Sequence, residues 1–312
     1  MSPTRAPRPT DLVALVTFDE DVRQNLAITR ERIAHGNSAP TPLAAAIEQW
    51  LHLGRRTWVT VAGRQIRGIA TARELTAKHA WEIDTLIEAD DSDSRAVLED
   101  LLRQAIVMAE DAPVTRLLLR TPADSIAAEA APRAGFSLVQ GERLWSGRLA
   151  PTSTTTSGVR NWTEGDAFAS FQVYCRSMPV AARQSMAMTV DEWNAVRDRH
   201  WQERGDGALV VEHEGRVVGT ARYARGSGQF TLVAEPGAHA ATDALVAAIA
   251  RRLGDVDRHI ALIAASGATE DAALRRAGLQ VESNAYALFC KRVLRPVREE
   301  TYARASIPVT GR

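Results

Sequence analysis

The sequence contains few cysteines, and neither a disulfide framework nor a metal site is expected from them. Cys175 and Cys290 are the two cysteines in 312 residues. Two thiols in separate halves of the chain match neither the paired pattern of a small secreted scaffold nor the ligand spacing of a zinc site. We therefore expect two inert thiols, no bound metal and a cytoplasmic protein.

Net charge and long apolar runs are also lacking. Lysine plus arginine and aspartate plus glutamate number 38 each, so no overall field attracts nucleic acid or an anionic membrane. No run of about 18 apolar residues could cross a bilayer, and the first residues lack the apolar stretch of a signal peptide. We expect no nucleic-acid partner and no membrane association.

The sequence does contain an internal duplication. The segment GRQIRGIATAR at 63–73 reappears as GRVVGTAR at 215–222, and Arg-Ala-Gly-Phe at 133–136 reappears as Arg-Ala-Gly-Leu at 276–279. A period of about half the chain indicates two copies of one domain, because solenoid repeats recur at a far shorter period. Each copy, at about 150 residues, is long enough to bury its own core.

A segment of small polar residues at 150–158 separates the copies. It has no apolar periodicity, so we predict that it is a linker. The first domain is then predicted at 1–149 and the second at 159–294. The charged, proline-containing residues at 295–312 are predicted to form a tail without a fold.

Apolar spacing predicts a similar order of elements in both copies. In the first copy we expect strands at 12–18, 57–61, 66–74, 81–88 and 114–120, two closing strands near 136–139 and 144–149, and helices at 21–34, 42–53, 94–110 and 124–134. In the second copy we expect strands at 159–162, 208–212, 216–224, 229–234 and 259–264, two closing strands near 279–282 and 285–293, and helices at 165–176, 190–203, 241–253 and 269–277.

This order of elements resembles the GNAT acetyltransferase superfamily, present in tandem. The resemblance rests on the acidic strand WEIDTLI at 81–87, the helix beginning with Ala-Val-Leu at 96–98, the opening segment at 159–167 and the two Arg-Ala-Gly motifs. It implies an α/β fold class with a mixed sheet, in which two tandem GNAT-like domains each have a mostly antiparallel sheet flanked by helices. It also implies transfer of an acetyl or short acyl group from acetyl-CoA or another acyl-CoA to a small-molecule amine.

The resemblance further implies a coenzyme site where the central strand leads into the long helix. In the second copy this region is neutral and made of small residues, and the cofactor-binding residues implied there are Leu232, Val233, Gly237, Ala238, His239, Ala240 and Thr242. In the first copy Asp90, Asp91 and Asp93 would repel a pyrophosphate. We therefore predict that the first copy is degenerate.

A general base is the next requirement of such chemistry. Glu82 and Asp84 stand on the central strand of the first copy, where the resemblance implies a base, although a solvated strand face is an equal alternative. The second copy has Gln229 at this place, and Glu235 at the end of the strand is the nearest substitute. An exposed loop glutamate is the alternative for Glu235.

The tyrosine that the family commonly uses as an acid is missing. Ala131 and Leu274 stand four residues before the glycines of the two Arg-Ala-Gly motifs. Tyr286 and Tyr223, on two predicted strands of the second copy, are the candidate replacements, and packed strand aromatics are the alternative for both. Methionines and tryptophans between 162 and 201 indicate either an apolar acceptor pocket or the packed core of two helices.

Two functions remain open at this stage. The first is an acyl-CoA-dependent N-acyltransferase, and the second is a non-catalytic or repurposed GNAT scaffold that binds another ligand or a protein partner without acyl-CoA. The missing tyrosines, the acidic first loop and the separation of base and loop between the copies favour the second. We expect a monomer or a homodimer in either case.

Overall fold

The computed structural model describes residues 4–20, 24–35, 42–50, 55–75, 79–89, 94–150, 156–186, 188–193 and 206–293. The first copy contains β1 (Thr4–Arg5), α1 (Leu12–Glu20), α2 (Arg30–His35), α3 (Pro42–Trp50), β2 (Arg55–Ala62), β3 (Gln65–Glu74), β4 (Ala80–Glu88), α4 (Ser94–Glu110), β5 (Arg116–Pro122), α5 (Ile126–Arg133) and β6 (Ser137–Gly147). The second contains β7 (Val159–Asn161), α6 (Ala167–Ser177), α7 (Val180–Met186), β8 (Gly207–His213), β9 (Arg216–Ala224), β10 (Gln229–Ala234), α9 (His239–Leu253), β11 (His259–Ala264), α10 (Ala268–Arg276) and β12 (Gln280–Arg292).

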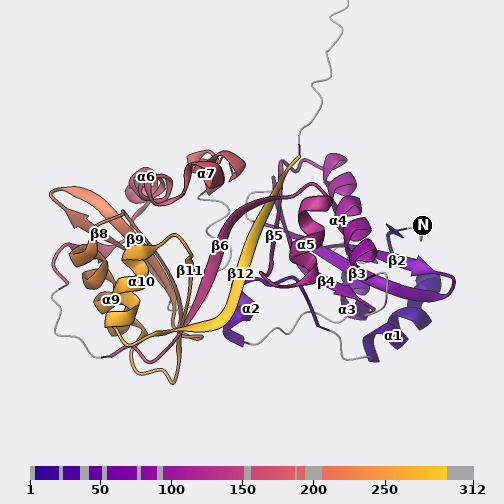
Figure 1. The fold of residues 1–312 in the computed structure, drawn as a ribbon, viewed down its shortest axis with the longest axis horizontal. Coiled ribbons are helices and arrows are strands. Elements are labelled where there is room, and N and C mark those ends of the chain that lie inside the picture. The colour runs from indigo at the N-terminus through magenta and orange to yellow at the C-terminus, as the bar shows by residue number, and fades with distance from the viewer. Residues whose placement is uncertain are drawn as a thin grey trace, which may run out of the picture.

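The two copies share one sheet of twelve strands, in the order β1-β2-β3-β4-β5-β12-β6-β11-β10-β9-β8-β7. Strand β4 runs parallel to β5 and β10 runs parallel to β11, whereas the other neighbours are antiparallel. Helices flank the sheet in both halves, with β6 and β12 between them (Figure 1). This arrangement confirms the predicted fold class.

The closing strands differ from the prediction. Each copy ends in one long strand rather than two short ones: β6 continues through Gly141, and β12 continues with a shift in register between Val281 and Ala285. Strand β12 of the second copy lies beside β5 of the first, and β6 of the first copy lies beside β11 of the second. The copies have therefore exchanged their last strands.

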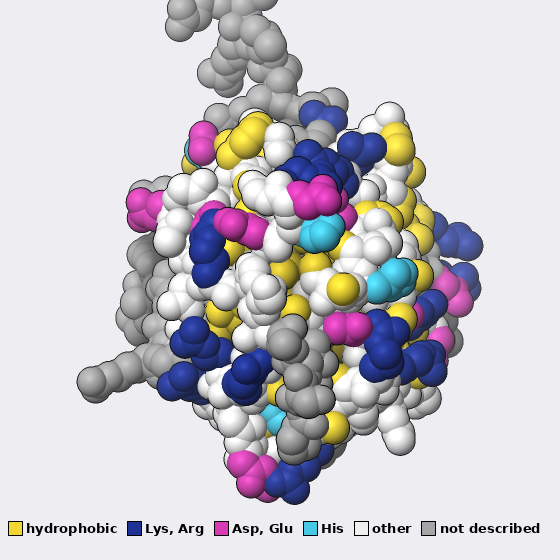
Figure 2. Space-filling view, turned by 90° about the vertical axis from the view of Figure 1, so that its left-hand side faces the viewer, with side chains coloured by type: hydrophobic (Ala, Val, Ile, Leu, Met, Phe, Trp, Pro, Cys, Tyr) yellow, Lys and Arg dark blue, Asp and Glu magenta, His cyan; other side chains and the backbone are white. Residues whose placement is uncertain are grey.

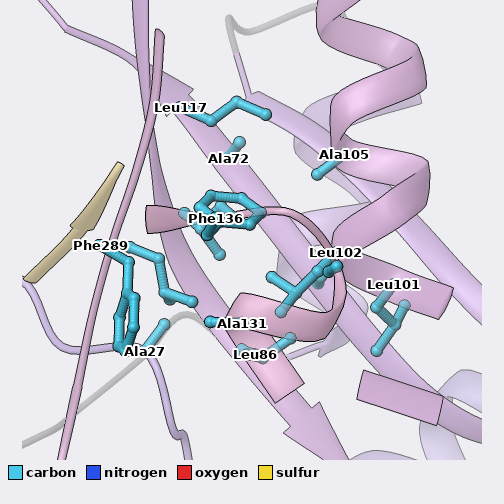
Figure 3. Close-up of a cluster of buried hydrophobic side chains, with 14 of the residues drawn as sticks. Ala27, Ala72, Leu86, Leu101, Leu102, Ala105, Leu117, Ala131, Phe136 and Phe289 are labelled. Atoms are coloured by element: carbon cyan, nitrogen blue, oxygen red, sulfur yellow. The ribbon is translucent and has the colours of Figure 1, made fainter. Parts of the chain in front are cut away.

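The exchange places a side chain of the second copy in the core of the first. Phe289 of β12 pairs with Leu119 of β5 and is buried in one apolar cluster with Leu117, Phe136 and Ala27. Figure 3 shows this cluster around Phe136 and Phe289. The core of the first copy is therefore completed by the C-terminal strand.

Two predicted elements near the N-terminus are wrong. Residues 12–18 belong to helix α1, because Pro9 and a hydrogen bond from the Arg8 N–H to the Asp11 carboxylate (2.7 Å) form a helical turn just before them. A short apolar run does not by itself distinguish a strand from a buried helix. The helix predicted at 21–34 is extended over 24–29 and helical from Arg30.

Two further differences concern the helices of the second copy. Helix α7 lies between the helices predicted at 165–176 and 190–203 and was not predicted. Of the helix predicted at 190–203, residues 190–193 are helical, and 194–203 lie outside the described residues. The remaining predicted helices and strands are confirmed with small shifts of their ends. Helix α4 has the predicted bounds, because its apolar residues follow one face throughout.

The repeated sequence motifs have physical causes. A Cβ atom on Gly68 would lie 2.7 Å from Cγ1 of Val97 on α4, and one on Gly219 would lie 2.9 Å from Cγ1 of Val211. Both positions therefore need glycine so that neighbouring elements can pack closely. The glycines of the two Arg-Ala-Gly motifs both have φ of +93°, which ends the preceding helix.

The N-terminal turns carry another repeat, which sequence inspection missed. The guanidinium of Arg5 binds the Asp11 carboxylate in the first copy (2.6 and 2.9 Å), and that of Arg160 binds the Asp166 carboxylate in the second (2.7 and 2.6 Å). Hydrogen bonding to Arg160 lowers the pKa of Asp166 to about 2. The spacing of six residues between arginine and aspartate was the available signal.

Candidate functional site

A gap opens between two parallel strands of the second copy. Strands β10 and β11 pair at their starts, through Gln229 with Ile260 and Phe230 with Ala261, and separate beyond these residues. A cavity of about 270 Å³ lies there. Its lining includes Thr231–Ala234 of β10 and Leu262–Ala264 of β11. The gap exposes strand edges to any molecule that enters the cavity.

The equivalent gap in the first copy is filled by the chain itself. Strands β4 and β5 pair from Ala80 to Ile83 and then separate. The segment 24–29 enters between them: the Leu26 N–H donates to the Leu86 carbonyl, and the Ile28 N–H donates to the Arg120 carbonyl, both at 2.8 Å. The buried segment therefore acts as an extra strand in this gap.

Asn25 fixes this segment through its side-chain amide. Its Nδ2 donates to the Asp84 carbonyl (3.1 Å), and its Oδ1 accepts from the N–H groups of Ala27 (3.0 Å) and Leu86 (2.8 Å). Ala27 is fully buried and lies near Phe289 in Figure 3. Backbone groups of β4 and β5 that would be open to a ligand in an empty gap are thus hydrogen-bonded to the segment 24–29.

The wall of the cavity that comes from the first copy is charged. Ion pairs connect five side chains in the order Arg73, Glu82, Arg120, Glu142 and Arg30, with distances of 2.7, 3.6, 2.5 and 3.2 Å. Three of them, Arg30, Glu82 and Arg120, line the cavity.

Burial has different outcomes for the last two members of this chain, Glu142 and Arg30. Burial alone would raise the pKa of Glu142, but the attraction of Arg120 and Arg30 outweighs it and lowers the pKa. Burial lowers the pKa of Arg30 despite the attraction of Glu142. The attraction of Glu142 thus does not fully offset the burial of the Arg30 guanidinium.

The first turn of α10 closes the other side of the cavity. A carboxylate oxygen of Glu270 accepts a hydrogen bond from the Ala234 N–H (2.8 Å), and the Thr269 hydroxyl accepts one from the Gly237 N–H (3.0 Å). Both side chains line the cavity. Burial raises the pKa of Glu270 above its usual range. A carboxylate with a raised pKa accepts a proton more readily than an ordinary glutamate, as a general base requires.

The remaining wall is mostly apolar and comes from α6, α7 and the residues after them. It contains Tyr174, Met178, Met186, Met188 and Trp193. The rings of Tyr174 and Trp193 lie 5.7 Å apart and both pack near Phe171. Burial raises the pKa of Tyr174, so its hydroxyl stays protonated. These side chains form a pocket wall as well as a packed cluster.

The structure separates the predicted catalytic residues. Glu82 lines the cavity, but the buried Asp84 carboxylate is held by the Thr71 hydroxyl (2.5 Å) and by the guanidinium groups of Arg55 (2.7 Å) and Arg32 (3.3 Å). Neither is a solvated strand face. The Asp84 carboxylate is thus engaged by three side chains of the first copy.

The other two predicted catalytic residues lie outside the cavity lining. Glu235 is paired with Arg176 (2.5 Å) and Arg216 (2.9 Å). Tyr286 is buried in an apolar cluster with Leu144 and Leu262, and burial raises its pKa. The structure thus gives Glu235 a place in a surface ion-pair group and Tyr286 a place in the core.

Two of the predicted coenzyme-binding residues, Leu232 and Val233, line the cavity. In the loop that follows, the Ala238 N–H donates to the Glu235 carbonyl (3.1 Å) and the His239 N–H donates to the Gly237 carbonyl (2.8 Å). Ala240 is exposed in the first turn of α9. Thr242 is buried, and its hydroxyl donates to the Ala238 carbonyl (2.8 Å). The acidic residues of the first loop, 90–93, lie outside the described residues.

Sequence analysis missed Arg30 and Glu270, which belong to α2 and α10. Neither residue stands in a recognisable motif, because their importance comes from burial beside a cavity formed by distant segments. The acidic first turn of the helix predicted at 269–277 was the one signal for Glu270.

Outside the cavity, we looked for charged patches on the face drawn in Figure 2, and for metal-binding groups and membrane-spanning helices among the described residues. Acidic and basic side chains are interspersed on the end of the molecule formed by the second copy (Figure 2). Within the described ranges, no group of three histidine, cysteine or acidic side chains is arranged to hold a metal. In the same ranges, no helix is long and apolar enough to cross a membrane.

Comparison with known proteins gives matches among solved structures. No protein-family model matches the sequence, and no curated protein matches it. A protein of Pyrococcus horikoshii assigned as an acetyltransferase has 11% identity and a TM-score of 0.51, over 95% of this chain and 91% of that chain. A GCN5-related N-acetyltransferase of Sphaerobacter thermophilus has 18% identity and a TM-score of 0.48, over 94% of this chain and 96% of that chain.

A tandem GNAT protein of the clavulanic acid biosynthesis pathway also matches, with 14% identity and a TM-score of 0.42, over 92% of this chain and 94% of that chain. At these identities the likeness concerns the fold. The Pyrococcus match covers nearly the whole of both chains and therefore includes both copies of the domain in this chain. The chain therefore has the GNAT fold, present twice and joined in one sheet.

Proposed function

We propose that the protein is an acyl-CoA-dependent N-acyltransferase that transfers an acetyl or other short acyl group to a small-molecule amine. The asymmetry of the two gaps carries this proposal. The gap between β10 and β11 opens into a cavity, whereas the gap between β4 and β5 is filled by the segment 24–29. The second copy binds the thioester, and the first copy supplies one wall of the site.

Backbone groups of β10 provide the polar contacts for the thioester. The Ala234 N–H faces the gap, where it donates to Glu270. The N–H of Leu232 faces the same side, because backbone groups two residues apart in a strand point in one direction. A donor aimed into a gap of low polarity stabilises the negative charge that develops on a thioester oxygen.

Glu270 and Tyr174 supply the proton transfers in this proposal. Glu270 takes a proton from the acceptor ammonium, and the free amine attacks the thioester carbonyl. The new C–N bond forms as the C–S bond breaks, and the amide nitrogen releases its second proton to solvent. Glu270 also returns its proton to solvent, and the leaving thiolate takes a proton from the neutral Tyr174 hydroxyl. Tyr174 is then reprotonated from solvent. Both side chains line the cavity, so both lie where such a reaction would occur.

Calorimetry with acetyl-CoA tests the coenzyme site. Ala240→Asp places a carboxylate in the first turn of α9, where the pyrophosphate is expected, and we expect it to weaken binding about tenfold or more through charge repulsion. The neutral Ala240→Asn variant is the matched control and should bind like the wild type. Arg95→Asp alters the corresponding position of α4 in the first copy and should also leave binding unchanged. Absence of acetyl-CoA binding to the wild type contradicts the proposal.

Glu270→Gln tests the base. A base acts in its deprotonated form, and the raised pKa of Glu270 predicts that the wild-type transfer rate falls, as pH decreases, at a higher pH than for an ordinary glutamate. The glutamine variant should lose about 100-fold or more in rate and lose this pH dependence. Glu129→Gln, with a side chain 64% exposed, is the control.

Thermal melts of Glu270→Gln provide an independent check. A carboxyl whose folded pKa is raised contributes stability that is present below the unfolded pKa and is lost as pH rises through the folded pKa. Glutamine carries no charge, so the variant should gain stability relative to the wild type between mildly acidic and neutral pH. If the melting temperatures of the variant and the wild type differ by the same amount at mildly acidic pH and at neutral pH, the raised pKa of Glu270 is contradicted.

One observation supports the alternative, a repurposed scaffold that binds another ligand without acyl-CoA. Thr269 and Glu270 already occupy the N–H groups of Gly237 and Ala234, two donors on the expected path of the coenzyme. Under the main proposal, acyl-CoA displaces these side chains. Under the alternative, they remain in place and the cavity binds a smaller molecule.

A further inference from the structure

We infer that the cavity recognises an α-amino acid in its zwitterionic form, with an apolar side chain. The identification of this amino acid as the acceptor amine rests on the proposed function, but its binding does not. Three features meet in one cavity: a guanidinium that shares its acidic partner, a carboxylate that has no basic partner among the described residues, and an apolar wall.

Arg30 supplies the guanidinium. Its side chain is 27% exposed and, among the residues that the structure describes, makes one ion pair, to Glu142 at 3.2 Å. Glu142 is shared, since it also binds the Arg120 guanidinium at 2.5 Å and accepts from the Gln140 amide at 3.1 Å. One carboxylate, that of Glu142, therefore serves two guanidinium groups at this wall of the cavity, and the charge of Arg30 is only partly compensated. A ligand carboxylate would compensate it.

Glu270 supplies the opposite charge. Its residue is 5% exposed, and its carboxylate accepts from the Ala234 N–H, but within the described part of the chain it forms no ion pair. The neighbouring Asp271 does have a basic partner, Arg143. A buried carboxylate without a cation is costly, and a ligand ammonium would compensate it.

The size and lining of the cavity define the rest of the ligand. A volume of about 270 Å³ lies just below the range of roughly 300–1,000 Å³ that is usual for drug-sized ligands, so a small molecule fits. The apolar lining includes Met178, Met186, Met188, Trp193 and Leu288. A simple anion would leave Glu270 uncompensated, and a simple amine would leave Arg30 uncompensated. An apolar amino acid satisfies both charges and covers the wall.

The inference also fits the proposed reaction. The ammonium beside Glu270 would lose its proton to that carboxylate, and the amine nitrogen would form the bond to the acyl carbon as the C–S bond breaks. The nitrogen would then release its second proton to solvent, and the thiolate would take a proton from Tyr174. The carboxylate beside Arg30 would orient the molecule without reacting. The products would be an N-acyl amino acid and free CoA.

Calorimetry on the wild-type protein without coenzyme tests the inference. The ligands are L-phenylalanine, L-methionine and L-leucine, together with phenethylamine, which lacks the carboxylate, and 3-phenylpropionate, which lacks the amine. We expect at least one of the amino acids to bind, and phenylalanine to bind at least about tenfold more tightly than either analogue. Failure of all three amino acids to bind, or equal binding of phenylalanine and an analogue, overturns the inference.

Two variants assign the charges. Arg30→Gln should weaken binding of the amino acid about tenfold or more while leaving phenethylamine unchanged, and Glu270→Gln should weaken the amino acid while leaving 3-phenylpropionate unchanged. Arg258→Gln, at a side chain 55% exposed, and Glu129→Gln are the controls. Thermal melts verify that each variant is folded. If a variant does not fold, the calorimetry of the five ligands with the wild-type protein still tests the inference.

The result is independent of the coenzyme experiment. Amino-acid binding without acetyl-CoA binding would leave this inference intact and contradict the proposed acyl transfer. Acetyl-CoA binding without amino-acid binding would overturn this inference and leave the proposed coenzyme site intact.

Discussion

Replacing Phe289 by alanine should lower the free energy of unfolding by about 3–5 kcal/mol, the usual cost of removing a buried phenylalanine. Phe289 is 3% exposed and lies in the core of the first copy, although it belongs to the last strand of the second. The change leaves a cavity beside Leu117 and Phe136. Because β12 pairs with both β5 and β6, the loss should be felt in both copies.

Urea unfolding monitored by tryptophan fluorescence and by circular dichroism measures this effect. Val281→Ala, at a position 40% exposed on the same strand, is the control and should change stability by less than about 0.5 kcal/mol. We expect coincident transitions with both probes, because one sheet joins the copies. Separate transitions, with the variant changing the second copy alone, would contradict the exchanged strands.

Replacing Asn25 by alanine should cost about 2–5 kcal/mol of folding free energy. The Asn25 side-chain oxygen is the acceptor for the buried N–H groups of Ala27 and Leu86, and its Nδ2 donates to the Asp84 carbonyl, which also accepts from the Arg32 guanidinium. Each buried polar group left without a partner costs roughly 1–3 kcal/mol, and relaxation of the segment recovers part of the total. The same segment leads directly to Arg30, so the variant should also weaken ligand binding in the cavity.

The free energy of unfolding from chemical denaturation measures this loss. The control is Asn161→Ala, at an exposed asparagine of β7 whose side chain accepts from Arg252 at 2.9 Å. It should change stability by less than about 0.5 kcal/mol. Equal stabilities of the two variants would show that the segment 24–29 does not hold the gap between β4 and β5.

The sequence predicted the elements well where local periodicity determines them. Helix α4 and the strands β9 and β10 follow their expected ranges because each buries a regular face. The exchange of β6 and β12 could not be predicted from the sequence, because an apolar strand has the same residue pattern whichever copy it pairs with. The segment 24–29 was missed because its hydrogen bonds are made to strands about 60 and 90 residues away.

The candidate site was predicted in part. The start of the long helix after β10 indicated the region of Leu232 and Val233, and these residues do line the cavity. Glu82 lines it too, as a member of a chain of ion pairs. Arg30 and Glu270 are 240 residues apart in the sequence, yet both line the cavity. Their spacing in the sequence does not indicate that they share a site.

A crystal structure of the protein with acetyl-CoA is the most direct measurement of the central claim, which is that the second copy binds the thioester. We predict that the pantetheine arm lies between β10 and β11, that Glu270 has released the Ala234 N–H, and that the segment 24–29 still fills the gap between β4 and β5. Coenzyme bound between β4 and β5, or a gap between β10 and β11 that stays empty at saturating acetyl-CoA, would contradict the account.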